Sequence, residues 1–427
     1  MEFDLMPPRD QIVLIMQRIY AYGMTTTSGG NLSILDDDGS IWITPAGVDK
    51  GRLRREDIVR VRADGRVEGP HRPSSEFPFH QAIYEARPDL RSILHAHPPA
   101  LVAFSIVRKT PDTRIIPQAR HICGEVGYAR YGLPGSAELG RYIAETFARG
   151  HETVLLENHG IVTAGLHLFQ AFQRFETLDF CARLTVNARI LGEPRSLTQA
   201  QLELFERKRG VLEPFVPPSH SSAEKELRQV LCELLHRAYD QQLVTSTEGT
   251  FSVRLDARSF LITPFGRDRK YIEPHDLVLI GDGRAESGKT PSRSVQLHQR
   301  IYGEHPGIGA IVIAHPPHAM AFGVVDAELN SRTIPESYVV LRGIPRVPYG
   351  TQFMDIAALS ATLSPKTPVV MVENDCFIAT GASLAQAYDR LEVAEFSAKA
   401  LIQAKPLGPV VSIDAEQVKA LEQMVDG

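Results

Sequence analysis

Apolar and polar residues follow two different periods along the chain. Residues 9–23, RDQIVLIMQRIYAYG, space apolar side chains three and four apart and end in glycine, which predicts an amphipathic helix. NLSIL, SIWITP, DIVRVRAD and GRVEG are typical of short strands, with DDDG and ADG turns between them. Helical spacing returns in FPFHQAIYEARP, SAELGRYIAETFARG and residues 166–192, whereas SILHAHPP and TVLLENHG indicate strands. Hairpin strands mixed with helices favour an antiparallel sheet covered by helices.

The same series of segments occurs twice. ITPAG at 43–47 returns as ITPFG at 262–266, HQAIY at 80–84 as HQRIY at 298–302, and LENHGIVTAG at 156–165 as VENDCFIATG at 372–381. The offset between equivalent residues falls slowly, from 219 through 218 to 216. Solenoid units have only about 20 to 50 residues, so each copy is predicted to be a whole domain.

The stretch EPFVPPSHSS at 213–222 is predicted to link the copies, because its prolines cannot extend a helix. The predicted organisation is a first domain at 1–212, this linker, a second domain at 223–405 and a C-terminal tail at 406–427. A length of 427 residues exceeds the usual limit of one core and fits two domains.

Composition narrows the class of protein. Hydrophobic residues make up 43% and charged residues 23%, as in globular proteins. A net charge of -5 gives no basic field for nucleic acid or an anionic membrane, so an anionic substrate needs a local site. Four scattered cysteines without a CxxC pair are typical of reduced thiols. With no signal peptide pattern and no apolar run near ~18 residues, we expect a cytoplasmic protein.

HAHPP contains the first candidate for chemistry. On a strand, His95 and His97 point to the same face, at a spacing that one metal ion can bridge. A catalytic zinc needs a third protein ligand and an open position. His159 in ENHG is the candidate third ligand, and Gly160 permits a tight turn that exposes its imidazole.

The second copy lacks most of these groups. At the ligand positions it has Ile313, His315 and Asp375, although the flanking residues are retained. Loss of two histidines in an intact scaffold is easier to explain for metal ligands than for core residues. Glu76, replaced by Ser294, is by the same comparison a candidate general acid/base. The alternative for Glu76 is an acid that stabilises a helix N-terminus after a serine cap.

Small polar residues form a second candidate site. TTSGGNLS and RPSSE offer hydroxyl, amide and backbone N–H donors that can surround a phosphate, from Gly29, Gly30, Asn31, Ser74 and Ser75. Such clusters are more often simple turns. In the second copy they become TEGTFS and SRS, where Glu248 would repel an anion.

TSGGNLS, ITPAG, RPSSE, HAHPP and ENHG, in this order, resemble the class II aldolase/adducin family. The match covers the first copy and, through eroded motifs, the second to about residue 405. The resemblance implies an α/β fold of two tandem three-layer α/β/α domains, each with a largely antiparallel central sheet. It implies zinc held by His95, His97 and His159, and Glu76 as the acid/base. It also implies phosphate binding by Gly30, Asn31, Gly47, Ser74 and Ser75.

The chain departs from the family pattern in two places. Ala46 stands where sugar-phosphate aldolases of the family often have threonine, which removes one phosphate donor. Where those enzymes use a proton-donating tyrosine after an IP segment, this chain offers His121 after IIPQAR. His121 is therefore the second catalytic candidate. Glutamate at position 76 favours aldol chemistry, because the family's ribulose-phosphate 4-epimerases carry aspartate there.

The resemblance thus predicts a lyase that cleaves or forms a C–C bond in a phosphorylated ketose through a zinc-stabilised enediolate. Other divalent transition metals also suit three histidines with an open position. The alternatives are a decarboxylase, dehydratase or 4-epimerase acting on a sugar phosphate or sugar-acid phosphate, and a non-catalytic adducin-like binding protein. Family members assemble as fourfold rings, so we expect a homodimer of tandem chains forming a pseudo-fourfold ring.

Overall fold

The computed structural model describes residues 3–207 and 210–426. The chain divides into two compact units. The first contains residues up to Arg114 together with Gln118–Arg183, and the second contains Ile115–Pro117 and the residues from Leu184 onward. The limits of these units are set by which residues pack together in space, not by the sequence repeat. The domain boundaries inferred from the duplicated sequence remain a proposal.

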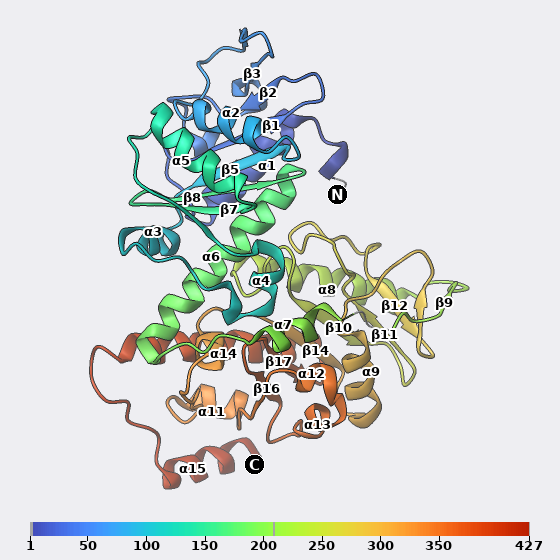
Figure 1. The fold of residues 1–427 in the computed structure, drawn as a ribbon. Coiled ribbons are helices and arrows are strands. Elements are labelled where there is room, and N and C mark those ends of the chain that lie inside the picture. The colour runs from blue at the N-terminus through green and yellow to red at the C-terminus, as the bar shows by residue number, and fades with distance from the viewer. Residues whose placement is uncertain (1–2, 208–209, 427) are drawn as a thin grey trace. The chain divides into compact units, whose positions relative to one another are not determined.

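The first unit is built on an eight-stranded sheet with the order β4-β3-β2-β1-β5-β8-β7-β6 (Figure 1). Its strands are β1 Asn31–Leu35, β2 Ile41–Ile43, β3 Val59–Val61, β4 Val67–Glu68, β5 Ser92–Ala96, β6 Gly127–Ala129, β7 Thr153–Leu156 and β8 Ile161–Gly165. The helices of the first repeat are α1 Pro8–Ala21, α2 Phe77–Ala86, α3 Pro99–Ile106, α4 Pro117–Cys123, α5 Ala137–Ala148 and α6 Leu168–Leu191.

Neighbouring residues on these strands pack into two different cores. Ile93 lies in the core that α2 and α5 cover, whereas Leu94 lies in the core that α1 and α6 cover. On β8, Val162 likewise lies in the core under α2 and α5, and Ile161 in the core under α1 and α6. Because side chains alternate across a strand, the sheet is buried on both faces and forms the middle of three layers.

The second unit repeats this architecture in a nine-stranded sheet with the order β15-β16-β17-β14-β10-β11-β12-β13-β9. Its strands are β9 Pro214–Phe215, β10 Thr250–Arg254, β11 Ser259–Ile262, β12 Val278–Gly281, β13 Arg284–Glu286, β14 Ala310–Ala314, β15 Arg346–Val347, β16 Val369–Val372 and β17 Cys376–Gly381. Its helices are α7 Gln199–Glu206, α8 Ser222–Asp240, α9 Val295–Glu304, α10 Ala319–Gly323, α11 Pro335–Leu341, α12 Thr351–Met354, α13 Ile356–Ala361, α14 Leu384–Ala404 and α15 Ala415–Asp426.

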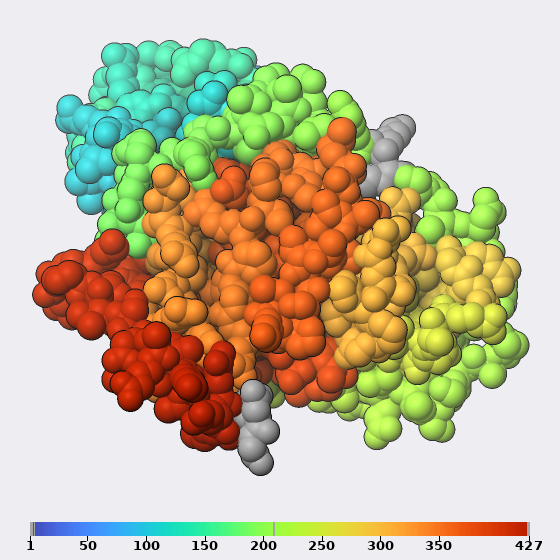
Figure 2. All heavy atoms as spheres, turned by 90° about the horizontal axis from the view of Figure 1, so that it is seen from below, coloured from blue at the N-terminus to red at the C-terminus, as the bar shows by residue number. Residues whose placement is uncertain are grey.

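The predicted fold class is confirmed. Reversed, the second sheet has the strand order of the first, with β9 added beside β13. The strand pairs are antiparallel except β6 with β7, β13 with β9, and β15 with β16. The sequence pattern did not predict β6, β8 or the C-terminal helix α15. This helix packs against α11, where the Tyr338 hydroxyl donates to Glu422 at 2.7 Å, and its dark red atoms lie at the surface in Figure 2.

The four cysteines are buried free thiols, in keeping with the absence of a CxxC pair. Within residues 3–207 and 210–426, no helix has the length and apolar character needed to cross a membrane.

A buried polar group joins the sheet to a helix in both repeats. In the first, the Ser33 hydroxyl on β1 lies 2.7 Å from His80 Nδ1 and 2.8 Å from the Tyr84 hydroxyl, both on α2. In the second, Ser252 on β10 makes the same two contacts at 2.7 Å with His298 and Tyr302 on α9. The shared group therefore belongs to the scaffold of the domain.

Burial lowers the pKa of His298 from 6.5 to about 3, so this imidazole stays neutral in the folded protein. Below pH 6.5 the unfolded chain binds a proton that the folded chain does not, so stability falls as pH falls. The loss at pH 5 is about 2 kcal/mol for this residue. We expect His298→Leu to reduce the drop in unfolding free energy between pH 7 and pH 5 by that amount in denaturant titrations. An unchanged drop would contradict the neutral burial of His298.

Candidate active site

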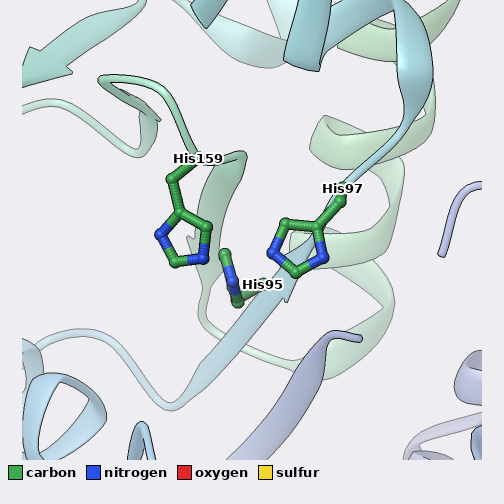
Figure 3. A group of neighbouring side chains, drawn as sticks. All are labelled: His95, His97 and His159. Atoms are coloured by element: carbon green, nitrogen blue, oxygen red, sulfur yellow. The ribbon is translucent and has the colours of Figure 1, made fainter. Parts of the chain in front are cut away.

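The position of β5 in the sheet places the first two histidines. This strand lies between β1 and β8, and His95 is paired with Asn31 on one side and Val162 on the other. His95 is fully buried, and His97 follows one residue beyond the end of β5. Figure 3 shows both rings directed toward the ring of His159.

His159 comes from the turn between β7 and β8. Its backbone N–H donates to the Leu156 carbonyl at 3.2 Å, and Asn158 adopts the left-handed conformation of the turn with φ 51°. Gly160 has a different reason to be glycine from the one we predicted. A Cβ there would lie 2.6 Å from both the Ala96 carbonyl oxygen and His97 Cδ2. Close packing against the strand end, and not the turn conformation, requires a residue without a side chain.

The three imidazoles form one cluster. One possible ligand atom from each lies within 4.8 Å of the others, and the ring centroids are 4.6, 4.8 and 5.0 Å apart. His95 Nδ1 donates to the Ile161 carbonyl at 2.9 Å, so its Nε2 lone pair faces the cluster. The Nε2 atoms of His95 and His97 are buried without a hydrogen-bond partner in the described structure. Imidazole nitrogens with such unsatisfied lone pairs fit a divalent transition metal.

Burial keeps these imidazoles neutral. It is the main cause that lowers the pKa of His95 well below its usual range, and the charges of His97 and His159 add to it. Burial, followed by the charge of His159, lowers the pKa of His97 to about 4. The pKa of His159 is also lowered by burial, while Glu76 opposes the shift. At neutral pH the three lone pairs are therefore available for a metal.

Glu76 is the N-cap residue of α2, but its side chain makes no capping hydrogen bond. Its Oε2 accepts from Asn31 Nδ2 at 2.7 Å and lies 3.3 Å from His95 Nε2. Its Oε1 lies 3.6 Å from His159 Nε2 and has no hydrogen-bond partner among the described residues. The carboxylate is thus turned toward the imidazoles and does not cap the helix.

The predicted phosphate residues occupy two neighbouring loops and one strand end. Residues 44–46 and 72–74 run antiparallel, with hydrogen bonds of 3.0 and 3.1 Å and a bridge between Pro45 and Pro73. Gly47 and Ser75 are exposed beside this bridge, and the buried Ser74 hydroxyl accepts from the Glu76 backbone N–H. Gly30, with φ 76°, packs against the His95 carbonyl oxygen, and the Asn31 amide contacts Glu76.

Sequence reasoning missed Lys50. Its buried ammonium donates to the carbonyls of Pro45 and Val48 at 2.8 and 3.3 Å, under the loop that carries Gly47. Burial lowers the pKa of Lys50. The sequence did carry a signal for it, a basic residue retained at the same position of both repeats, since Arg269 is the equivalent of Lys50 in the second repeat. His121 is exposed on α4, and its catalytic assignment stays a prediction.

Among the described residues of the second repeat, no three side chains form a comparable metal-binding cluster. Ile313 is paired between Thr250 and Ile378, where His95 lies in the first repeat. The Asp375 carboxylate accepts from Gln352 Nε2 at 3.0 Å. Arg293 forms an ion pair with Glu248 at 3.6 Å, and its guanidinium lies 4.0 Å from the centre of the Phe205 ring of α7.

Three known proteins each resemble about half of the chain. 5-deoxy-D-ribulose 1-phosphate aldolase of Bacillus thuringiensis is 28% identical, covering 48% of this chain and 96% of its own length. 3-oxo-tetronate 4-phosphate decarboxylase of Pectobacterium atrosepticum is 34% identical, covering 43% and 85%. A solved structure of L-fuculose 1-phosphate aldolase is 31% identical, with a TM-score of 0.42, and covers 46% of this chain and 93% of that one.

The family profile described as "Class II Aldolase and Adducin N-terminal domain" matches this chain twice. The matched segments are residues 10–186, which contain the whole first sheet, and residues 229–402, which contain β10 to β17 of the second. The double match agrees with the duplicated motifs and with the repeated strand order. The chain therefore belongs to the class II aldolase and adducin family, with two copies of the family domain.

Proposed function

We propose that the first repeat is a metal-dependent lyase that cleaves or forms a C–C bond in a phosphorylated ketose. The observation that carries this proposal is the cluster of three imidazoles with the Glu76 carboxylate 3.3 to 3.6 Å from two of them. His95, His97 and His159 would hold zinc, or another divalent transition metal, with one position open for substrate. When bound, such an ion acts as a Lewis acid on the carbonyl oxygen of the ketose.

Glu76 carries the proton in this proposal. In cleavage, C3–C4 breaks and the carbon that keeps the bonding electrons takes up a proton, and in condensation the same carbon loses one. Glu76 Oε1 is the oxygen turned toward the imidazoles without a hydrogen-bond partner in the described structure, so it is available for this transfer. The opposite proton transfer, at the hydroxyl of the departing carbonyl fragment, is assigned to His121.

The loops beside the cluster would bind the phosphate. Gly30, Gly47, Ser74 and Ser75 would supply backbone and hydroxyl donors, with the Ser74 hydroxyl in contact with the Glu76 backbone N–H and the Lys50 ammonium beneath the Gly47 loop. Asn31 was predicted to take part in the same binding. Fixing the phosphate positions the reacting carbons against the imidazole cluster, and such positioning lowers the barrier by removing the entropy of encounter.

A decarboxylase is the second candidate, because 3-oxo-tetronate 4-phosphate decarboxylase is 34% identical to this chain over the aligned region. Loss of carbon dioxide from a 3-oxo acid leaves the same kind of carbon-centred charge next to a carbonyl. The two reactions therefore need the same cluster. The release of triose phosphate from ketose 1-phosphates, compared with the release of carbon dioxide from a 3-oxo-tetronate 4-phosphate, distinguishes them.

Metal analysis tests the site. We expect roughly one zinc ion per chain, because the described residues contain one three-histidine cluster. Zinc at about 100 times its Kd should add about 2.7 kcal/mol to the unfolding free energy of the metal-free protein. His95→Ala should abolish both effects, whereas Asp375→Ala, at the His159 position of the second repeat, should preserve them. Equal losses in the two variants would refute a site confined to the first repeat.

Substitution of the carboxylate tests the chemistry. Glu76→Gln should lower kcat by about 100- to 10,000-fold, because a general acid/base contributes about that factor. Zinc content should stay at the wild-type level, since this side chain is not among the proposed ligands. Ser294→Ala, at the same position of the second repeat, is the matched control and should leave kcat unchanged. Wild-type turnover by Glu76→Gln would exclude Glu76 as the proton carrier.

We propose that two chains assemble so that four family domains form a ring, with the second repeat contributing an interface. Each chain has a mass of 47.3 kDa, so native mass spectrometry should find a dimer of twice that mass. A homodimer with two-fold symmetry is the commonest closed assembly. A monomer at micromolar concentration would contradict this arrangement.

A further inference from the structure

A line of buried hydrogen bonds leads from the core of the first unit to Glu76. The Tyr84 hydroxyl contacts Ser33, Ser33 contacts His80 Nδ1, His80 Nε2 contacts Asn31 Oδ1, and Asn31 Nδ2 contacts Glu76 Oε2. The four distances are 2.8, 2.7, 2.5 and 2.7 Å. Ser33 and His80 are fully buried and Asn31 is 3% exposed, so water does not compete for these contacts.

The direction of every hydrogen bond in this line follows from its last member. Asn31 turns its NH2 group to Glu76, where Nδ2 donates to Oε2, and its carbonyl oxygen to His80. That oxygen needs a donor, which makes Nε2 the protonated nitrogen of His80. Nδ1 then accepts from the Ser33 hydroxyl, and Ser33 accepts from Tyr84. Burial lowers the pKa of His80 to about 3, so the ring is neutral and carries one proton.

The second repeat contains the inner part of this hydrogen-bonded line but lacks the asparagine and the glutamate at its end. Ser252, His298 and Tyr302 retain the inner contacts. Thr250 replaces Asn31, and its hydroxyl contacts Ser292 at 2.7 Å. His298 Nε2 is consequently buried with no hydrogen-bond partner among the described residues. The serine, histidine and tyrosine serve the scaffold in both repeats, whereas the contact from histidine through asparagine to a carboxylate occurs in the repeat that has the imidazole cluster.

We propose that His80 and Asn31 are positioning residues that hold Glu76 in its working orientation. His80 fixes which way the Asn31 amide faces, and the amide fixes Glu76 Oε2, which leaves Oε1 directed at the cluster. The expected effect on kcat rests on the proposed function, whereas the expected tautomer and hydrogen bonds of His80 do not. It also gives Asn31 a task other than phosphate binding, since one of its two amide hydrogens is committed to Glu76.

The structural part is tested in metal-free protein by NMR of ¹⁵N-labelled histidine. We expect His80 to carry its proton on Nε2, and Asn31→Ala to shift that N–H signal and speed its exchange with water. The signals of His298 are the internal control and should not change. Finding His80 protonated on Nδ1, or unaffected by Asn31→Ala, would overturn the proposal whether or not the protein turns over a ketose phosphate.

The kinetic part uses matched variants in the two repeats. His80→Leu should lower kcat about 100-fold, the typical effect of misplacing a reacting group, with KM and zinc content close to wild type. His298→Leu removes the equivalent ring, which has the same serine contact but no asparagine partner, and should leave kcat unchanged. His80→Gln keeps a donor for Asn31 and should restore much of the lost rate. Equal effects of His80→Leu and His298→Leu on kcat would reduce His80 to a structural role.

Asn31→Ala covers the case in which His80→Leu does not fold. If Asn31 positions Glu76, kcat falls and KM for the phosphorylated substrate changes little. If Asn31 serves only the phosphate, KM rises and kcat is retained, which would overturn the proposal. A wild-type protein without activity on ketose phosphates, but with the expected His80 tautomer, would refute the proposed function and leave the hydrogen-bonded line standing.

Discussion

The pairing of β5 between β1 and β8 is the constraint on which the candidate site depends. This register places His95 opposite Asn31 and beside Val162, and it turns the His95 Nδ1 proton to the Ile161 carbonyl. A slip by one residue would turn His95 to the other face of the sheet. Cores on both faces of the strand oppose such a slip, because Ile93 and Leu94 pack into different helical layers.

The divergence of the two repeats took place on this common frame. Apart from β9, both have the same strand order, and both put an asparagine with positive φ in equivalent turns, Asn158 between β7 and β8 and Asn374 between β16 and β17. On this frame the side chains around the cluster position have changed. There Ile313 fills the place of an imidazole, and Arg293 pairs with Glu248 where the first repeat has Ser75 and Gly29. The backbone of the domain is therefore compatible with either set of side chains.

The sequence predicted the parts of the fold that depend on neighbouring residues. The period of two in SILHAHPP indicated β5, and the helical spacing in residues 9–23 indicated α1. The duplication exposed His95, His97 and His159 by comparing one copy with the other. Sequence could not show that Asn31 reaches Glu76 across 45 residues, because that contact depends on how α2 packs on the sheet. The closeness of Gly160 to the Ala96 carbonyl is also set by tertiary packing and has no local signature.

The short strand β9 has no counterpart in the first sheet, and this difference bears on how a duplicated chain avoids misfolding. Two domains with the same strand order on one polypeptide can exchange equivalent strands while they fold, and such misassembly is characteristic of multidomain and repeat proteins. β9 occupies the outer edge of β13, where another strand would otherwise add. Pro214 in β9 lacks the N–H group that a further strand would need. The segment between the repeats thus covers one edge of the second sheet and blocks the addition of a further strand there, including a strand from the first repeat.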